Sequence, residues 1–147
     1  MIDTRTAPYA ALLLRVSLGA LFLAHAALKL VVFTPAGTAK FFASVGLPAE
    51  LAYVTIAAEV LGGLALILGL GTRIVAVALA PILLGAIVTV HGAAGFFFSN
   101  AHGGWEYPAF WACALIVQAL LGDGAYALGS TWRKNAVTGT VAKAYSH

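Results

Sequence analysis

Hydrophobic residues run along this chain in four long stretches separated by short polar or glycine-rich connections. The stretches cover residues 9–33, 51–70, 74–98 and 108–128. A helix of about 20 mainly apolar residues crosses the ~30 Å hydrocarbon core of a bilayer, so each stretch is long enough to be a transmembrane helix. Short connections make neighbouring helices antiparallel. The pattern therefore predicts an all-α membrane protein built as an up-down-up-down four-helix bundle.

The composition agrees with a membrane protein and excludes several other classes. Hydrophobic residues make up 62% of the chain and charged residues only 9%, whereas a soluble domain carries about 25% charged residues. The net charge is +3 without a basic run, which argues against nucleic acid as a partner. The one cysteine, Cys113, excludes an internal disulfide and a CxxC dithiol, and we expect it to be a packing residue.

The distribution of basic residues predicts the orientation. Four crossings place both termini on one side of the membrane, together with Arg5, Arg73, Arg133, Lys134 and Lys143. The opposite connections hold Lys40. Because cytoplasmic loops are enriched in lysine and arginine, we expect both termini to be cytoplasmic.

The ends and the first connection have their own signals. Arg15 interrupts the first apolar stretch, whose remainder exceeds the roughly 7–15 residues of a signal-peptide core, so we expect this helix in the mature protein. Residues 1–130 are predicted to form the membrane domain and 131–147 a polar cytoplasmic tail. Within the first connection, residues 38–45 are predicted to form a short amphipathic helical turn at the interface.

Polar residues inside the apolar stretches are where function is to be sought, because ionisable groups in a bilayer are costly and face the bundle interior. Arg15, His25 and Lys29 recur at helical spacing and share one face of the first helix. On the second helix, Glu59 is followed one turn later by Gly62 and Gly63, and small residues let membrane helices approach closely.

The helical rise brings several of these groups to similar depth. We predict one polar cluster in the outer half of the bundle, acting in ligand binding or proton relay and formed by His25, Lys29, Glu59 and His91. The third connection lies above this cluster, and its His102, Trp105 and Glu106 form a predicted outer gate. In the inner half, Arg15 and Asp123 are predicted to form a structural ion pair between the first and fourth helices.

Each of these assignments has a purely structural alternative. Lys29 reaching to the interface would need no binding role. His25 and His91 would serve equally as hydrogen-bonded packing residues. The segment around His102 would serve as a glycine turn with interfacial aromatic residues.

Four segments carry a resemblance to a known family. They are LLRVSLGALFLAHAALKL (13–30), FFASVGLP (41–48), AEVLGGLALILGLGTR (58–73) and HGAAGFFFSNAHGGWEYP (91–108). The chain resembles the DoxX family of small four-helix bacterial membrane proteins, over about residues 10–130. The run AE-x-x-GG-x-x-x-x-x-GL-x-TR is the most specific part of the likeness.

The resemblance implies a cellular location and a type of complex, but it does not imply a catalytic mechanism. The family takes its name from a subunit associated with quinone-linked oxidation of reduced sulfur compounds, and other members resemble membrane parts of complexes that pair with soluble redox or detoxifying enzymes. It implies the bacterial inner (plasma) membrane and supplies no agreed catalytic residues. Distant relatives are described as membrane cargo receptors, so the fold alone does not decide function.

The leading hypothesis is a membrane subunit of a redox-linked complex that binds a quinone or a similar lipid-soluble molecule. His25, Lys29 and His91 would donate hydrogen bonds, Glu59 would move protons, and Phe22, Phe96 and Trp105 would form walls. Without CxxC or nucleotide motifs in the sequence, redox chemistry would come from a bound cofactor or a partner.

Three further hypotheses stay open at this point. The first is transport of a small solute or protons, for which a homo-oligomer would widen the narrow interior of the bundle. The second is a non-catalytic assembly or receptor role, and the third is a metal or haem site. The last would use His25, His91 and Glu59, without a ligand spacing that supports it.

Overall fold

The structure is a computed structural model that describes residues 3–129, and every regular element in that range is helical. The predicted tail, 131–147, lies outside the described residues. The long helices are α1 (Ala7–Ala27), α3 (Leu51–Leu68), α4 (Thr72–Ala86) and α5 (Glu106–Leu121), and α2 (Pro35–Ser44) is shorter. Helix α1 continues into the π-helical segment η1 (Leu28–Val32), and α4 into η2 (Ile87–His91) and a 3-10 turn, η3 (Gly92–Ala94).

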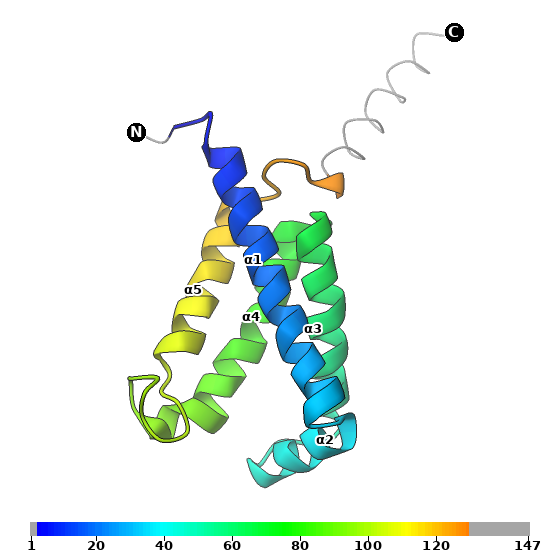
Figure 1. Ribbon diagram of the computed structural model, residues 1–147, viewed down its shortest axis with the longest axis vertical. Coiled ribbons are helices and arrows are strands. Elements are labelled where there is room, and N and C mark those ends of the chain that lie inside the picture. The colour runs from blue at the N-terminus through cyan, green and yellow to red at the C-terminus, as the bar shows by residue number, and fades with distance from the viewer. Residues whose placement is uncertain (1–2, 130–147) are drawn as a thin grey trace, which may run out of the picture.

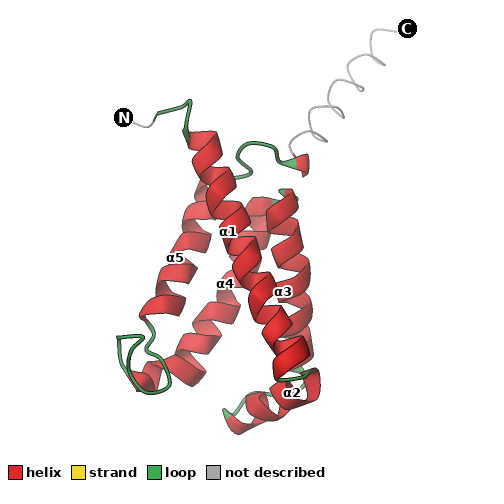
Figure 2. Cartoon of the chain, in the orientation of Figure 1, coloured by secondary structure: helices red, strands yellow, loops and turns green. Residues whose placement is uncertain are grey.

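The helices α1, α3, α4 and α5 alternate in direction (Figure 1). Helix α2 lies across one end of the molecule (Figure 2), where the α4–α5 loop also lies, and we call this the α2 end. The first turn of α1 and the segment after α5 meet at the opposite end, the Pro8 end, where the Ala125 N–H donates to the Pro8 carbonyl at 2.9 Å. The sequence predicted a helical turn at 38–45, and the helix found there starts earlier, where Thr34 Oγ1 accepts from the Gly37 N–H as an N-cap.

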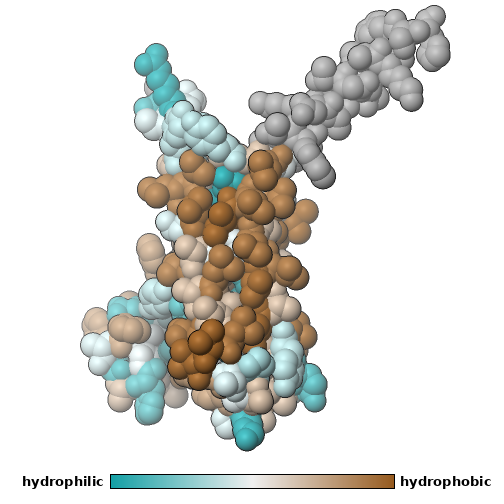
Figure 3. Space-filling model, turned by 45° about the vertical axis from the view of Figure 1, so that its right-hand side comes forward, coloured by the Kyte–Doolittle hydropathy of each residue, from teal (hydrophilic) through white to brown (hydrophobic). Residues whose placement is uncertain are grey.

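Within residues 3–129, three helical spans are long and apolar enough to cross a membrane: Ala7–Val32, Leu51–Leu68 and Thr72–Ala94. Helix α5 has 16 residues, about 24 Å of helix, which is shorter than these. Figure 3 shows hydrophobic side chains over the middle of the viewed face and hydrophilic ones near its ends. Large apolar side chains such as Ile74 and Val88 are about four-fifths exposed, at 78% and 81%, as expected of a surface that faces lipid.

Two of the predicted helix bounds were wrong, in both cases because a glycine ends the helix inside an apolar run. The third stretch was predicted to stay helical to Phe98, but Gly95 has φ +84° and residues 96–98 lie in a loop. The fourth was predicted to reach Leu128, but the helix ends at Leu121, and Gly122 follows with φ +86°. Glycine adopts positive φ without the cost of a Cβ clash, so apolar composition alone does not mark these ends.

A core of apolar side chains joins the long helices. Phe22 of α1 and Trp111 of α5 lie with ring centroids 4.6 Å apart. Buried leucines complete this core from each long helix: Leu18, Leu66, Leu79, Leu83 and Leu115.

Glycines set the closest helix contacts. A Cβ on Gly19 of α1 would lie 2.6 Å from the Gly63 carbonyl oxygen, and one on Gly63 would lie 2.9 Å from the Gly19 carbonyl oxygen. The neighbouring Gly62 faces α4 instead, where its Cβ would lie 2.8 Å from Leu79 Cδ2. Adjacent glycines on α3 thus allow close approach on two sides, as small residues do in membrane helix pairs.

We predict that Gly19→Ala destabilises the protein because the added methyl group meets backbone atoms of α3. Overpacking of this kind typically costs about 1–3 kcal/mol. Gly85→Ala in α4 is the matched control, because nothing lies within 4 Å of its Cβ position. Thermal unfolding in mild detergent should give a lower midpoint for Gly19→Ala than for Gly85→Ala. Equal midpoints would show that α1 and α3 are not in this close contact.

Candidate functional site

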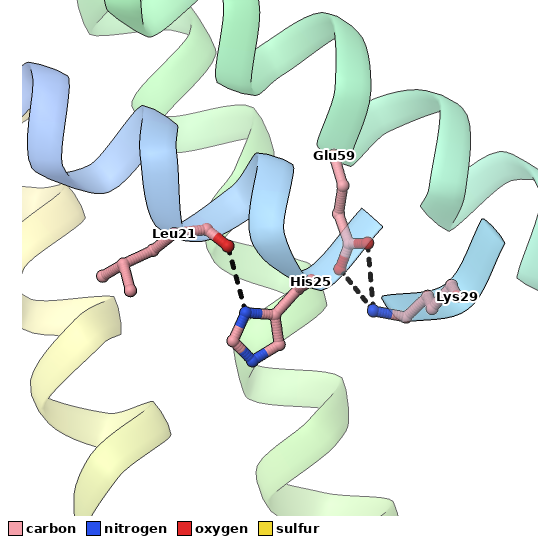
Figure 4. Close-up of polar contacts among 4 residues, drawn as sticks. All are labelled: Leu21, His25, Lys29 and Glu59. Carbon is pink, nitrogen blue, oxygen red and sulfur yellow. Dashed lines mark hydrogen bonds and ion pairs between the residues drawn. The ribbon is translucent and has the colours of Figure 1, made fainter. Parts of the chain in front are cut away.

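A largely buried ion pair links η1, the continuation of α1, to α3 near the α2 end. Lys29 Nζ lies 2.8 Å from Glu59 Oε1 and 3.0 Å from Oε2 (Figure 4). The Lys29 and Glu59 side chains are 18% and 3% exposed. Side chains of a helix tilt toward its N-terminus, and α1 and α3 run in opposite directions. Lys29 therefore leans back along α1 while Glu59 leans toward the α2 end, so that the two meet.

His25 does not share a hydrogen bond with this pair. Its Nδ1 lies 3.0 Å from the Leu21 carbonyl oxygen (Figure 4). Its ring packs against Trp111 of α5, with 4.9 Å between ring centroids. Helix α1 ends at Ala27, and Lys29 lies in the π-helical segment η1, which does not keep the α-helical register. The predicted common face of His25 and Lys29 therefore divides, with His25 toward α5 and Lys29 toward α3.

His91 is also tied to a backbone carbonyl. It lies in η2, and its Nδ1 is 2.8 Å from the Gly103 oxygen in the α4–α5 loop. Both Lys29 and His91 lie in π-helical segments. Such segments are rare in proteins overall, and those that occur are often at functional sites. The contacts thus divide the predicted four-residue cluster into one ion pair and two separately anchored histidines.

The metal hypothesis gains no support from this geometry. Among residues 3–129, no three His, Cys, Asp or Glu side chains come together as a group that could hold a metal ion. His25, His91 and Glu59 all lie in that range, and their contacts point to different neighbours.

Hydrogen bonds hold the α4–α5 loop in a defined shape. The N–H groups of Trp105 and Glu106 donate to the carbonyls of Gly95 and Phe96, each at 3.0 Å. The Glu106 side chain then turns back, and its Oε1 accepts from the Phe98 N–H at 2.7 Å. The two arms of the loop are therefore joined by backbone bonds, and Glu106 fixes the position of the phenylalanines.

This loop forms one side of a groove with a volume of about 820 Å³. The groove combines an α1 residue with residues of the loop and the first turns of α5, and its lining is His25, Phe96, Phe98, Glu106, Tyr107 and Phe110.

The predicted outer gate is only partly at this groove. Glu106 lines it. Trp105 packs edge-on against Phe96 with centroids 4.8 Å apart, so it supports a wall. His102 is exposed with φ +70° and is not among the lining residues.

Sequence reasoning found some groove residues and missed others. Phe96 was expected as a wall and lines the groove, whereas Phe22 was expected there and is fully buried in the core. Phe98, Tyr107 and Phe110 were missed. Tyr107 and Phe110 stand three residues apart at the start of α5. This spacing places two side chains on the same side of a helix, and it could have been recognised in the sequence.

Arg15 is buried near the Pro8 end, with 1% of its surface exposed. Its Nη2 donates to the Ala125 carbonyl at 3.2 Å, and the charge of Asp123 acts on the guanidinium. Asp123 lies in the segment after α5 and not inside a fourth helix, so the contact joins α1 to that segment. A direct Arg15–Asp123 ion pair stays a prediction.

A match to a family model shows which protein family this chain belongs to. Residues 10–92 match the family model described as DoxX. The chain belongs to the DoxX family. The match includes Arg15, His25, Lys29, Glu59 and His91, whereas Glu106 and the rest of the α5 side of the groove lie beyond it.

A curated relative points to a broad class of chemistry. The chain is 48% identical over 79 residues to a protein of Bacillus subtilis (strain 168) named "Putative oxidoreductase CatD". The matched region is 54% of this chain and 58% of that protein, so the chain spans less than two thirds of the relative's length. No solved structure matches the chain. The family and the apolar helices together establish a DoxX-type membrane protein with an oxidoreductase-named homologue.

We predict that Glu59→Gln and Lys29→Met each destabilise the protein strongly, because each leaves a charge buried without its partner. Breaking a buried ion pair in this way typically costs about 3–5 kcal/mol. The double variant should lose less than the sum of the two single variants. Unfolding free energies in detergent form the double-mutant cycle, with Lys40→Met as the control because Lys40 is exposed. Additive losses would show that the pair does not couple α1 to α3.

Proposed function

We propose that this DoxX-family chain is an integral membrane subunit of a redox-linked complex, and that it binds a quinone or a similar lipid-soluble molecule. The observation that carries the proposal is the groove at the α2 end, where aromatic walls surround His25 and Glu106.

The size and lining of the groove suit an aromatic head group. Small-molecule sites typically have volumes of about 300–1,000 Å³, mostly apolar walls and a few polar groups that fix orientation. The groove has about 820 Å³ and aromatic side chains from α5 and its preceding loop. His25 and Glu106 would hydrogen-bond the head group, and both residue types exchange protons readily.

Electrons would come from outside this chain. The sequence has one cysteine and no nucleotide-binding motif, while the matched B. subtilis protein carries an oxidoreductase name. The arrangement favours a membrane subunit that hands its ligand to a soluble redox or detoxifying enzyme. A second copy of the chain would be a further partner within the bilayer.

We propose that α5 and the apolar residues after it make a fourth crossing in the bacterial plasma membrane. Arg5 and Arg73 lie toward the Pro8 end and Lys40 lies in α2, at the other end. The excess of arginine favours a cytoplasmic Pro8 end. The groove would then open in the outer leaflet.

This orientation predicts the labelling of two cysteine variants in a Cys113→Ala background. Lys40→Cys should react with a membrane-impermeant maleimide on intact spheroplasts, because α2 faces outward. Arg5→Cys should react only after permeabilisation. Labelling with the two patterns exchanged would invert the proposed topology, and labelling of both from outside would contradict it.

Ligand binding in the groove predicts a co-purifying molecule that depends on the aromatic wall. Protein purified in mild detergent should retain a quinone at near one-to-one ratio, measured by mass spectrometry of an organic extract. Phe110→Ala should lower that ratio several-fold through lost contact area, whereas Ile116→Ala on the same helix should not. Both residues are well exposed, at 76% and 56%, so neither change should unfold the protein.

The same experiment can defeat the proposal. An extract that contains only bulk phospholipid would favour a non-catalytic assembly role. Equal loss of quinone in Phe110→Ala and Ile116→Ala would show that the molecule binds the general lipid-facing surface and not the groove.

A further inference from the structure

The hydrogen bond of His25 determines which of its nitrogens carries a proton. Nδ1 lies 3.0 Å from the Leu21 carbonyl oxygen, and a carbonyl oxygen only accepts hydrogen bonds. Nδ1 is therefore the donor, and in the neutral ring Nε2 is an unprotonated acceptor. The ring points away from the backbone of α1, with Nε2 on its far side from the Leu21 contact (Figure 4). A neutral His25, which lines the groove, therefore keeps Nε2 as a hydrogen-bond acceptor.

Glu106 presents a second acceptor. Its Oε1 accepts from the Phe98 N–H at 2.7 Å. In its carboxylate form Glu106 has no proton to donate, so its second oxygen also acts as an acceptor. The two groups come from different segments, α1 and the start of α5, and both line the groove.

Three donors near this region are already engaged within the protein. The Phe98 N–H is bound to Glu106, and the Lys29 ammonium is bound to both oxygens of Glu59. Nδ1 of His91 is bound to the Gly103 carbonyl. Two other donors lie nearby. The Tyr107 hydroxyl lines the groove and both donates and accepts, whereas the Trp111 indole N–H has no hydrogen-bond partner but is buried and is not part of the groove lining.

We propose that the groove selects the reduced form of its ligand, an aromatic molecule with two hydroxyl groups, over the oxidised quinone. A hydroquinone offers a donor to each of His25 and Glu106, whereas a quinone offers only carbonyl acceptors that face them unpaired. This inference rests on the proposed function, because it specifies the ligand of the same groove. Unpaired polar groups in a desolvated site are costly, and hydrogen bonds to charged groups are among the stronger ones.

The test compares trimethylhydroquinone, trimethylbenzoquinone and the dimethyl ether of the hydroquinone. Binding to the full chain in quinone-free nanodiscs is measured anaerobically by calorimetry. The hydroquinone should bind about tenfold or more tightly than the quinone, the factor that one additional hydrogen bond to a charged group supplies. The ether has the same ring without donors and should bind no better than the quinone.

The variant Glu106→Gln changes the chemistry with little change in shape. Glutamine can keep the bond from the Phe98 N–H through its amide oxygen and place an N–H₂ donor where the second carboxylate oxygen was. The preference for hydroquinone should fall about tenfold. Glu50→Gln is the matched control, since Glu50 is exposed and lies outside the groove lining. If Glu106→Gln does not fold, His25→Phe removes the other acceptor and should lower hydroquinone binding selectively.

The outcomes separate this inference from the function on which it rests. Equal or tighter binding of the quinone would overturn the redox preference and leave the quinone site standing. A preference that persists in both groove variants would overturn the roles of His25 and Glu106. Absence of binding by all three compounds would overturn the proposed function itself.

Discussion

Gly19 and Gly63 hold the backbones of α1 and α3 at a separation that any larger residue would prevent, and the position of the candidate site follows from that contact. With the helices this close, the Lys29 ammonium reaches both oxygens of Glu59. The ion pair fixes the rotation of α1 about its axis. His25, about one turn before Lys29, is then directed at Trp111 of α5, and the groove lies where α1 and α5 diverge toward the α2 end.

Much of the helical organisation was predictable from hydrophobic runs, because lipid and core both require apolar side chains along a spanning helix. The run from residue 51 gives α3 almost unchanged. The failures have a common cause. Gly95 and Gly122 take positive φ within apolar sequence, and hydrophobicity does not distinguish a glycine that packs in a helix from one that ends it. The predicted fourth crossing rests on the stretch 108–128, in which the helix α5 ends at Leu121.

Contacts in the candidate site were predictable only where the depth of the residues along their helices was enough to bring them together. Lys29 and Glu59 were expected in one cluster in the outer half of the bundle, and their side chains do meet. The directions of His25 and His91 depend on which neighbour each helix face meets, and periodicity along one helix does not contain that information. The remaining walls come from a loop whose shape is set by bonds such as that from the Phe98 N–H to Glu106. Such bonds join residues with no regular spacing, so no pattern in the sequence predicts them.

The contact of Arg15 with the segment after α5 has a consequence for the order of assembly. Proteins are synthesised from the N-terminus, so α1 carries its guanidinium into place long before Ala125, which accepts its hydrogen bond, has been made. The Pro8 carbonyl likewise awaits the Ala125 N–H. An arginine in a membrane helix is costly without a partner. Helix α1 is therefore completed by a segment that is synthesised 110 residues after Arg15.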